Sequence, residues 1–325
     1  MGVLNCCGSK NNEINNQMIF QTDFQSDLIT NDEKQNNNYK KIEENFKNTI
    51  KDQAEFISDK SFEEALGENL EYLNNIDFPK EIENKKEEDN IILQPIKFSN
   101  KEIYKGSWNA NKQRHGFGIN INTDGFIYKG LWDKDNIGNY GLFLYENGNY
   151  YKGELKQGKL DGKCEMEIKG KYKYVGDFSS DLPNGKGCLE DYENGFKYNG
   201  DMVNGVKEGK GILEYNDGVI YEGDFKNDLF NGFGVLKFKS GKQYEGEFVD
   251  GNIKGKGKFI WEDGKVYEGD YDNFMKNGFG KFSWSKDKYY EGQWLNNRQH
   301  GKGTLYYEGK EIEGLFRFGK IIKGN

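Results

Sequence analysis

The sequence predicts a mainly β fold: an elongated single-layer antiparallel sheet of about ten stacked hairpins. Three observations predict it. The pattern Tyr-x-Gly-x-aromatic recurs from Tyr104 onwards, and eight consecutive Tyr-to-Tyr steps are 23 or 24 residues long. Apolar and polar residues alternate around each copy, as in half-buried strands. Asn-Gly or Asp-Gly pairs such as Asp217-Gly218 separate the copies, and such pairs favour type I′ hairpin turns. A period this constant indicates a repeat array, which presents a long surface rather than one pocket.

One copy, residues 219–240, shows what each repeat can build. Tyr221, Gly223 and Phe225 alternate with acidic residues, which predicts a first strand. We interpret residues 231–234, Asn-Gly-Phe-Gly, as the break before a second strand. The aromatic side chains of successive copies are expected to form a ladder of cross-strand pairs on one face. The glycine between the two aromatics leaves room for a neighbouring ring.

These residues resemble the MORN repeat family (membrane occupation and recognition nexus), whose repeats read YxGxWxxGxxxGxGxxxxxxG. Residues 290–294 with 300–303, and residues 221–225 with 231–234, match that pattern well. The resemblance covers about two thirds of the chain. Some copies depart from the pattern, and we expect them to pack less regularly. The departures are Leu155 and Cys164 in the third copy, Met202 in the fifth, and Ile312 in place of tyrosine in a degenerate tenth.

Composition divides the chain into an array and an N-terminal segment that is partly disordered and partly helical. Apolar residues at spacings of three and four predict two amphipathic helices, the first ending near Ile57 and the second beginning with a capping box at Ser61 and Glu64. These helices either cap the array or lie in its aromatic trough, or they dock a partner; capping is favoured because solenoid ends need covering. The predicted segments are 1–10 for acylation, 11–38 as a flexible linker, 39–78 for the helices, 79–100 as a charged linker and 101–325 as the array.

The first ten residues carry a second signal. Gly2 is placed to accept a myristoyl chain, and Cys6 and Cys7 are placed for palmitoylation. One myristoyl chain gives only marginal membrane binding, so a second signal is needed. Because the segment that follows is acidic, added acyl chains rather than a polybasic patch supply it. The sequence therefore predicts a lipid anchor made of these three residues.

Charge and composition argue against several classes of function. Residues 1–100 contain 11 Lys and 20 Asp or Glu, a net charge of −9, and residues 101–325 contain 35 basic and 34 acidic residues, a net of +1. The array therefore has no basic footprint for nucleic acid. His115 and His300 occupy the same position of distant copies, and no metal-binding or nucleophile motif occurs. We expect no enzyme activity, no cofactor and no metal site.

The function expected from these features is a non-enzymatic, membrane-tethered scaffold that recruits proteins through its repeat surface. The resemblance implies work at the cell cortex, at membrane–cytoskeleton junctions or in cilia. Four cysteines without a disulfide framework and the lack of a membrane-spanning apolar run predict the cytoplasmic face of a membrane, such as the plasma membrane. One alternative is direct binding of phosphoinositide or phosphatidic acid; another is an accessory subunit of a lipid kinase. Exposed end strands also allow a homodimer. Candidate contact residues are exposed aromatic rings, which have an equal claim to be core: Tyr221, Phe225, Tyr244, Phe248, Tyr267 and Tyr271.

Overall fold

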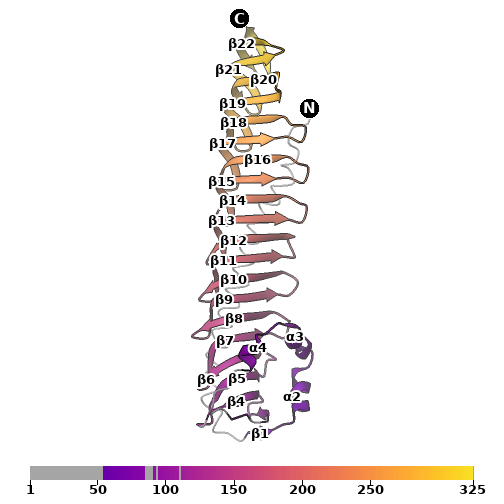
Figure 1. Ribbon diagram of the computed structural model, residues 1–325, viewed down its shortest axis with the longest axis vertical. Coiled ribbons are helices and arrows are strands. Elements are labelled where there is room, and N and C mark those ends of the chain that lie inside the picture. The colour runs from indigo at the N-terminus through magenta and orange to yellow at the C-terminus, as the bar shows by residue number, and fades with distance from the viewer. Residues whose placement is uncertain (1–53, 85–90, 93, 110, 325) are drawn as a thin grey trace. The chain divides into compact units, whose positions relative to one another are not determined.

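The computed structural model describes residues 54–84, 91–92, 94–109 and 111–324 of the 325-residue chain. The described residues fall into two compact units, the first ending at Glu193 and the second beginning at Asn194. Each unit is built on antiparallel strands, as Figure 1 shows. The predicted mainly β, antiparallel fold is therefore confirmed in each unit. The predicted segments 1–10 and 11–38, and most of the first predicted helix, lie outside the described residues.

In the first unit, the short strand β1 is followed by three short helices and then by the remaining strands. Strands β4 to β11 pair with one another in chain order, β2 and β3 pair with β4, and β1 pairs with β3. The three short strands thus cover the free edge of β4. The elements of this unit are β1 Glu55–Phe56, α2 Asp59–Leu66, α3 Asn69–Asn75, α4 Lys80–Glu83, β2 Ile91–Ile92, β3 Ile96–Lys97, β4 Ile103–Trp108, β5 Arg114–Ile121, β6 Ile127–Asp133, β7 Asn136–Leu144, β8 Tyr150–Lys156, β9 Lys159–Ile168, β10 Tyr172–Ser179 and β11 Leu182–Asp191.

The second unit consists of strands that pair antiparallel in chain order, from β12 to β23. Its strands are β12 Phe196–Val203, β13 Val206–Tyr215, β14 Ile220–Lys226, β15 Leu229–Lys237, β16 Gln243–Val249, β17 Asn252–Ile260, β18 Val266–Asp272, β19 Met275–Ser285, β20 Lys288–Leu295, β21 Arg298–Tyr307, β22 Lys310–Arg317 and β23 Lys320–Gly324.

Strands β14 and β15 show how a repeat is joined. Gly223 lies opposite Gly234, and the register then shifts so that Asp224 lies opposite Asn231. Residues 231–234 are therefore part of β15, at a β-bulge, and the prediction that they form the break between strands is wrong. The break falls earlier, at residues 227–228 between the two strands.

The tight turn of each repeat also differs from the expectation. Asn227 and Asp228 both have positive φ, +48° and +64°, the signature of a type I′ turn. At Asp217-Gly218, where the type I′ turn was predicted, only the glycine of the pair has positive φ, +86°, so that prediction is wrong. Asn and Asp tolerate the left-handed region because their short polar side chains bond locally, and this places the type I′ turn inside the repeat.

Each repeated tyrosine except Tyr151 lies across a pair of glycines on neighbouring strands. The Tyr221 hydroxyl donates to the Asp224 carbonyl at 2.8 Å. A Cβ on Gly223 would stand 2.6 Å from the Gly234 Cα, and one on Gly234 would stand 2.5 Å from the Tyr221 ring. The predicted role of the glycine, room for a ring, is confirmed. In other copies, the tyrosine hydroxyl likewise donates to the backbone carbonyl of the residue three positions later. The tyrosines that make this bond are Tyr104, Tyr128, Tyr174, Tyr198, Tyr244, Tyr267 and Tyr290.

The third copy replaces one of these glycines by Cys164. Gly153 lies opposite it, and the Cys164 thiol donates to the Glu154 carbonyl at 3.3 Å. Glu154 follows Tyr151 by three residues, so the thiol takes the carbonyl that a tyrosine hydroxyl takes in the other copies. Burial raises the pKa of the Cys164 thiol to about 12, which keeps it protonated and able to donate at neutral pH.

The helices differ in their bounds from the prediction. Ser58, not Ser61, is the N-cap of α2: its hydroxyl accepts from the Ser61 backbone N–H at 3.1 Å. Gly67, with φ of +52°, ends α2, so the second predicted helix is two helices. Glu55 and Phe56 form strand β1 where the first predicted helix was to end. The predicted charged linker 79–100 contains α4, β2 and β3.

Candidate interaction surface

The predicted contact rings are buried. Tyr221, Tyr244 and Tyr267 are 0% exposed, and Phe225, Phe248 and Tyr271 are 3%, 2% and 7% exposed. Tyr221 contacts the ring of Phe225 in its own copy and of Phe248 in the next, both edge to face with centroids 5.2 Å apart. The prediction that these six rings are exposed is wrong. The three tyrosines that begin a copy lie across their glycine pairs, and the other three rings pack edge to face against their own tyrosine and against the tyrosine of the preceding copy. They form the core of the second unit, which was the other reading of the same residues.

The opposite face of the sheet carries the residue after each repeated tyrosine and the residues paired with it across the strands. In the first unit, helices α2 to α4 pack on this face beside strands β4 to β8 (Figure 1). The helices neither lie in the trough of tyrosines nor cover the edge of β4. Phe78 contacts Phe117 of β5 and Tyr140 of β7, with ring centroids 6.0 and 5.6 Å apart. The cluster on this face also contains Phe62, Leu66, Leu73, Ile121, Ile127, Leu142 and Leu144.

Lysines of the sheet flank this apolar contact. Lys105 pairs with Asp59 at 2.8 Å, and Lys129 pairs with Glu83 at 2.5 Å. Lys152 donates to the Asp77 carbonyl at 2.8 Å. The three lysines are the residues that follow the first three repeated tyrosines. The first unit thus shows how this face holds an acidic, amphipathic helical segment.

On the same face of the second unit, the structure places no helix among the described residues, and a shallow groove of about 770 Å³ lies open. Phe233 and Phe279 line it and are 52% and 54% exposed. Both occupy the repeat position of Phe117, the middle residue of Gly-x-Gly. The groove, lined by Phe233, Glu245, Lys256, Lys258, Glu268 and Phe279, therefore repeats the surface on which the helices dock in the first unit. Sequence reasoning missed it, although the alignment of the copies contained the signal.

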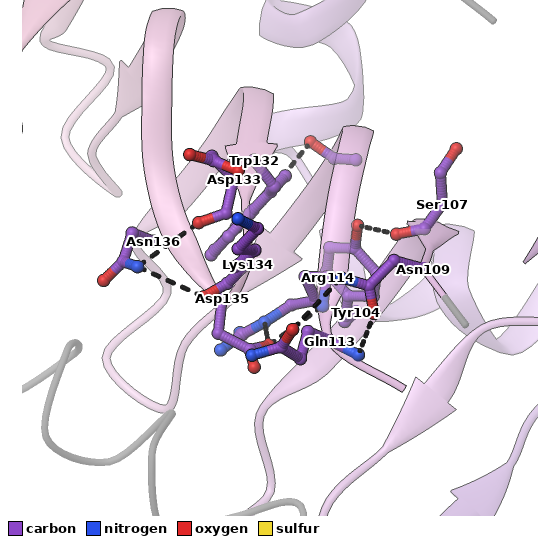
Figure 2. A network of polar contacts seen from close by, with 11 residues as sticks. Tyr104, Ser107, Asn109, Gln113, Arg114, Trp132, Asp133, Lys134, Asp135 and Asn136 are labelled. Atoms are coloured by element: carbon purple, nitrogen blue, oxygen red, sulfur yellow. Dashed lines mark hydrogen bonds and ion pairs between the residues drawn. The ribbon is translucent and has the colours of Figure 1, made fainter. Parts of the chain in front are cut away.

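Some repeats contain a buried cation that lies next to their aromatic rings. Figure 2 shows Arg114 and Asp135 side by side in the first unit, near Tyr104 and Trp132. The backbone N–H and the Nε of Arg114 donate to Asp135 Oδ1 at 2.9 and 3.2 Å, and the guanidinium lies 4.4 Å from the Trp132 ring centroid. Burial lowers the pKa of Arg114 to about 10, an effect that the Asp135 carboxylate opposes, so the group stays charged at neutral pH.

The second unit has two versions of this arrangement. Lys207 forms an ion pair with Asp228 at 3.0 Å, and both side chains are almost fully buried. Asn297 follows Lys276 by 21 residues, as Asp228 follows Lys207. The Asn297 amide oxygen accepts a hydrogen bond from the Lys276 backbone N–H at 2.9 Å. The Lys276 ammonium lies 4.9 Å from the ring centroids of Phe282 and Trp294. Burial lowers the pKa of Lys276 to about 8.

Other candidate residues bear less on a site. The predicted acylation residues Gly2, Cys6 and Cys7 lie outside the described residues. His115 lies 3.3 Å from an Asp133 carboxylate oxygen, and the His300 ring lies against Phe318 with centroids 5.1 Å apart. Within the described ranges, no three His, Cys, Asp or Glu side chains gather as metal ligands would. No helix in those ranges is both long and apolar enough to cross a membrane.

Solved structures similar to this chain share little of its sequence. The TCP domain of SAS-4 (dCPAP) of Drosophila melanogaster, in complex with a proline-rich motif of Ana2 (dSTIL), is 14% identical; the match covers 47% of this chain and 85% of that one, with a TM-score of 0.30. A mutant TCP10 domain of Danio rerio CPAP is 11% identical over 62% of this chain and 97% of that one, with a TM-score of 0.26. These scores are too low to inform function. No curated protein matches the chain.

The model of the MORN repeat family matches seven segments of the chain. They are residues 151–168, 174–195, 198–220, 221–243, 244–266, 267–288 and 290–309. The match leaves out the predicted copies that begin at Tyr104 and Tyr128 and the degenerate copy at Ile312, although Tyr104 and Tyr128 make the same hydroxyl bond as the later tyrosines. The chain therefore contains seven MORN repeats, and its remaining hairpins continue the same strand pattern.

Proposed function

We propose that this protein is a non-enzymatic scaffold that is held to a membrane by acyl chains on Gly2, Cys6 and Cys7. It recruits protein partners through the open groove of its second unit, at the cell cortex or at a ciliary or other cytoskeleton-associated membrane. The observation that carries the recruiting role is the exposure of Phe233 and Phe279 at the repeat position where the first unit partly buries Phe117 against its own helical segment. Large apolar side chains gathered in an open groove are typical of binding surfaces.

The charges in the groove favour a protein rather than an anionic lipid as the ligand. Lys256 pairs with Asp270 at 2.6 Å, and Lys281 pairs with Glu291 at 3.3 Å. Lysines whose charge is offset by a neighbouring carboxylate attract phosphate head groups weakly. Anionic liposomes are therefore the comparison ligand, and salt-sensitive binding of the repeats to them would argue for the lipid-binding alternative.

Membrane attachment is expected to require the acyl chains. The Gly2→Ala variant and the Cys6→Ser/Cys7→Ser variant should each move from the membrane pellet to the soluble fraction, because a single acyl signal gives only marginal binding. The measurement is fractionation of tagged full-length chains from the native cell, with a Cys188→Ser chain as the control that should stay with the membrane. If all three variants fractionate like the wild type, the repeats or another segment select the membrane.

Partner recruitment is expected to require the two groove phenylalanines. Phe233→Ser/Phe279→Ser should remove most of the neighbours that proximity labelling detects around the wild-type chain, while membrane attachment stays unchanged. Stability should change by no more than about 0.5 kcal/mol, because both rings are exposed. The matched control is Tyr307→Ser/Ile312→Ser, two residues that are 44% and 38% exposed outside the groove. An unchanged set of labelled neighbours would remove the groove from the proposal.

A further inference from the structure

The charge along the opposite face reverses between the two units. On strands β4 to β8, where the helices pack, a cross-strand row runs Lys105, Ile119, Lys129, Leu142 and Lys152, each residue opposite the next. On β9 to β11 the row continues with Glu165, Val175 and Cys188. In the second unit, the corresponding row runs Glu222, Val235, Glu245, Lys258, Glu268, Lys281 and Glu291. The part of the row beneath the helices therefore carries three positive charges, and the part from β14 to β20 carries four negative and two positive charges. The first three repeated tyrosines are followed by lysine, Tyr174 and Tyr198 are followed by the uncharged Val175 and Asn199, and the last four are followed by glutamate.

The first unit shows which kind of segment binds to a row of lysines. Its lysines face helices α2 to α4, and residues 59–84 contain eight acidic and two basic residues, a net charge of −6. Two of those acids form ion pairs with the row, Asp59 with Lys105 and Glu83 with Lys129. Charge complementarity across an interface of this kind sets the choice of partner more than it sets raw affinity. The row and the segment that it binds thus carry charges of opposite sign.

The apolar residues between the charged positions are similar in the two units, although the charges are reversed. Phe117 and Ile119 lie between Lys105 and Lys129 in the first unit, and the corresponding positions in the second unit are Phe233 and Val235, between Glu222 and Glu245. Glu222, Glu245 and Glu268 are exposed. In the part of the chain that the structure describes, none of these three forms an ion pair within 4.0 Å. Their charges are available to a ligand.

We propose that the groove of the second unit, together with the part of the row that adjoins it at Glu222 and Val235, binds a lysine- or arginine-rich amphipathic helix of a partner protein. The apolar stripe of the helix lies on Phe233, Val235 and Phe279, and its basic residues pair with Glu222, Glu245 and Glu268. The proposal rests on the recruiting role proposed above and adds the chemistry of the partner. An acidic helix, such as the chain's own α2–α4 segment, is rejected by the second unit because like charges would face each other.

Peptides built on the chain's own helical segment test the proposal against the full-length protein. The first peptide has the native sequence of residues 58–84. The second carries Asp59→Lys, Asp77→Lys, Glu81→Lys and Glu83→Lys, which raises its net charge from −6 to +2 while its apolar stripe is unchanged. A scrambled form of the second peptide controls for charge alone. Fluorescence anisotropy at physiological salt should show binding of the second peptide and none of the other two.

Reversing the row should abolish that preference. Glu222→Lys/Glu245→Lys should weaken binding of the basic peptide about tenfold, a factor that corresponds to about 1.4 kcal/mol. Glu193→Lys/Glu262→Lys makes the same change of net charge at exposed residues in turns, and should leave binding within twofold. Equal binding of the basic peptide and its scrambled form, or no loss in the first variant, would overturn the proposal. If the two phenylalanines are still needed for recruitment in the cell, only the charge of the partner is then wrong.

Discussion

Replacement of Gly234 by alanine is expected to lower the free energy of unfolding by about 3 kcal/mol, the upper part of the range for overpacked cores. The new Cβ would stand 2.5 Å from the Tyr221 ring, which is itself enclosed by Phe225 and Phe248. Because the ring is fully buried and its hydroxyl is held by the Asp224 carbonyl, it cannot move aside without loss of that bond. The measurement is urea unfolding of the full-length chain followed by tryptophan fluorescence.

A second glycine substitution separates this clash from a general effect of losing glycine. Gly264 lies in a turn with φ of +79°, and a Cβ built there meets no atom within 4 Å. Gly264→Asn should change stability by less than about 0.5 kcal/mol, since asparagine tolerates the left-handed region. The account of the glycine pairs fails if Gly234→Ala unfolds at the same urea concentration as Gly264→Asn.

Replacement of Asp228 by asparagine is expected to destabilise the second unit by about 3 kcal/mol, because it leaves the buried Lys207 ammonium without its carboxylate. The asparagine side chain can still accept the Lys207 backbone N–H, as Asn297 does for Lys276. The change therefore isolates the charge from the backbone bond. Asp250→Asn is the matched control, because Asp250 is exposed and also has positive φ. Equal stability of the two variants in urea would show that the ion pair contributes nothing.

The reciprocal exchange should stabilise the protein. Asn297→Asp gives the Lys276 ammonium a carboxylate, and we expect a gain of about 1 kcal/mol at pH 7. In the wild type, the Lys276 pKa of about 8 lies below its unfolded value of 10.5, so folding favours the neutral amine. The cost of burying the charged Lys276 amine is fully present below pH 8 and decreases as the pH rises. The free energy of unfolding should therefore increase by about 2 kcal/mol between pH 7 and pH 9.5. A rise that is as steep in Asn297→Asp would assign it to another group.

The strands could be predicted because each copy repeats the same alternation of apolar and polar residues. The position of the tight turn could not be predicted from the Asp-Gly pairs. The two residues that adopt positive φ in that turn are Asn227 and Asp228, and neither is a glycine. A local preference for glycine was outweighed by the pairing of the two strands. The buried cations were detectable in principle, because aligned copies place Asp228 and Asn297 each 21 residues after a lysine.

The candidate surface was harder to predict. Alternation tells which residues share a face, but it does not tell which face is closed. The rings of Tyr221 and Tyr244 looked available in a single-layer sheet, whereas in the structure each packs against the next copy and is fully buried. The exposed surface is instead built from the residues between them, including Phe233. Where the helices lie depends on contacts such as Phe78 with Phe117, which join residues far apart in the sequence.

Because Tyr221 contacts Phe248 of the next copy as Tyr244 contacts Tyr271, the core interactions reach from one copy to its neighbour. Excision of residues 244–266, one whole period, would bring Tyr271 to the place of Phe248 and leave every glycine pair matched. Gene-level gain or loss of a period is thus compatible with folding. Its effect would fall on spacing: Phe233 and Phe279 would become neighbours along the groove, with no Lys256 between them. Copy number can therefore tune which ligands fit while the core stays the same.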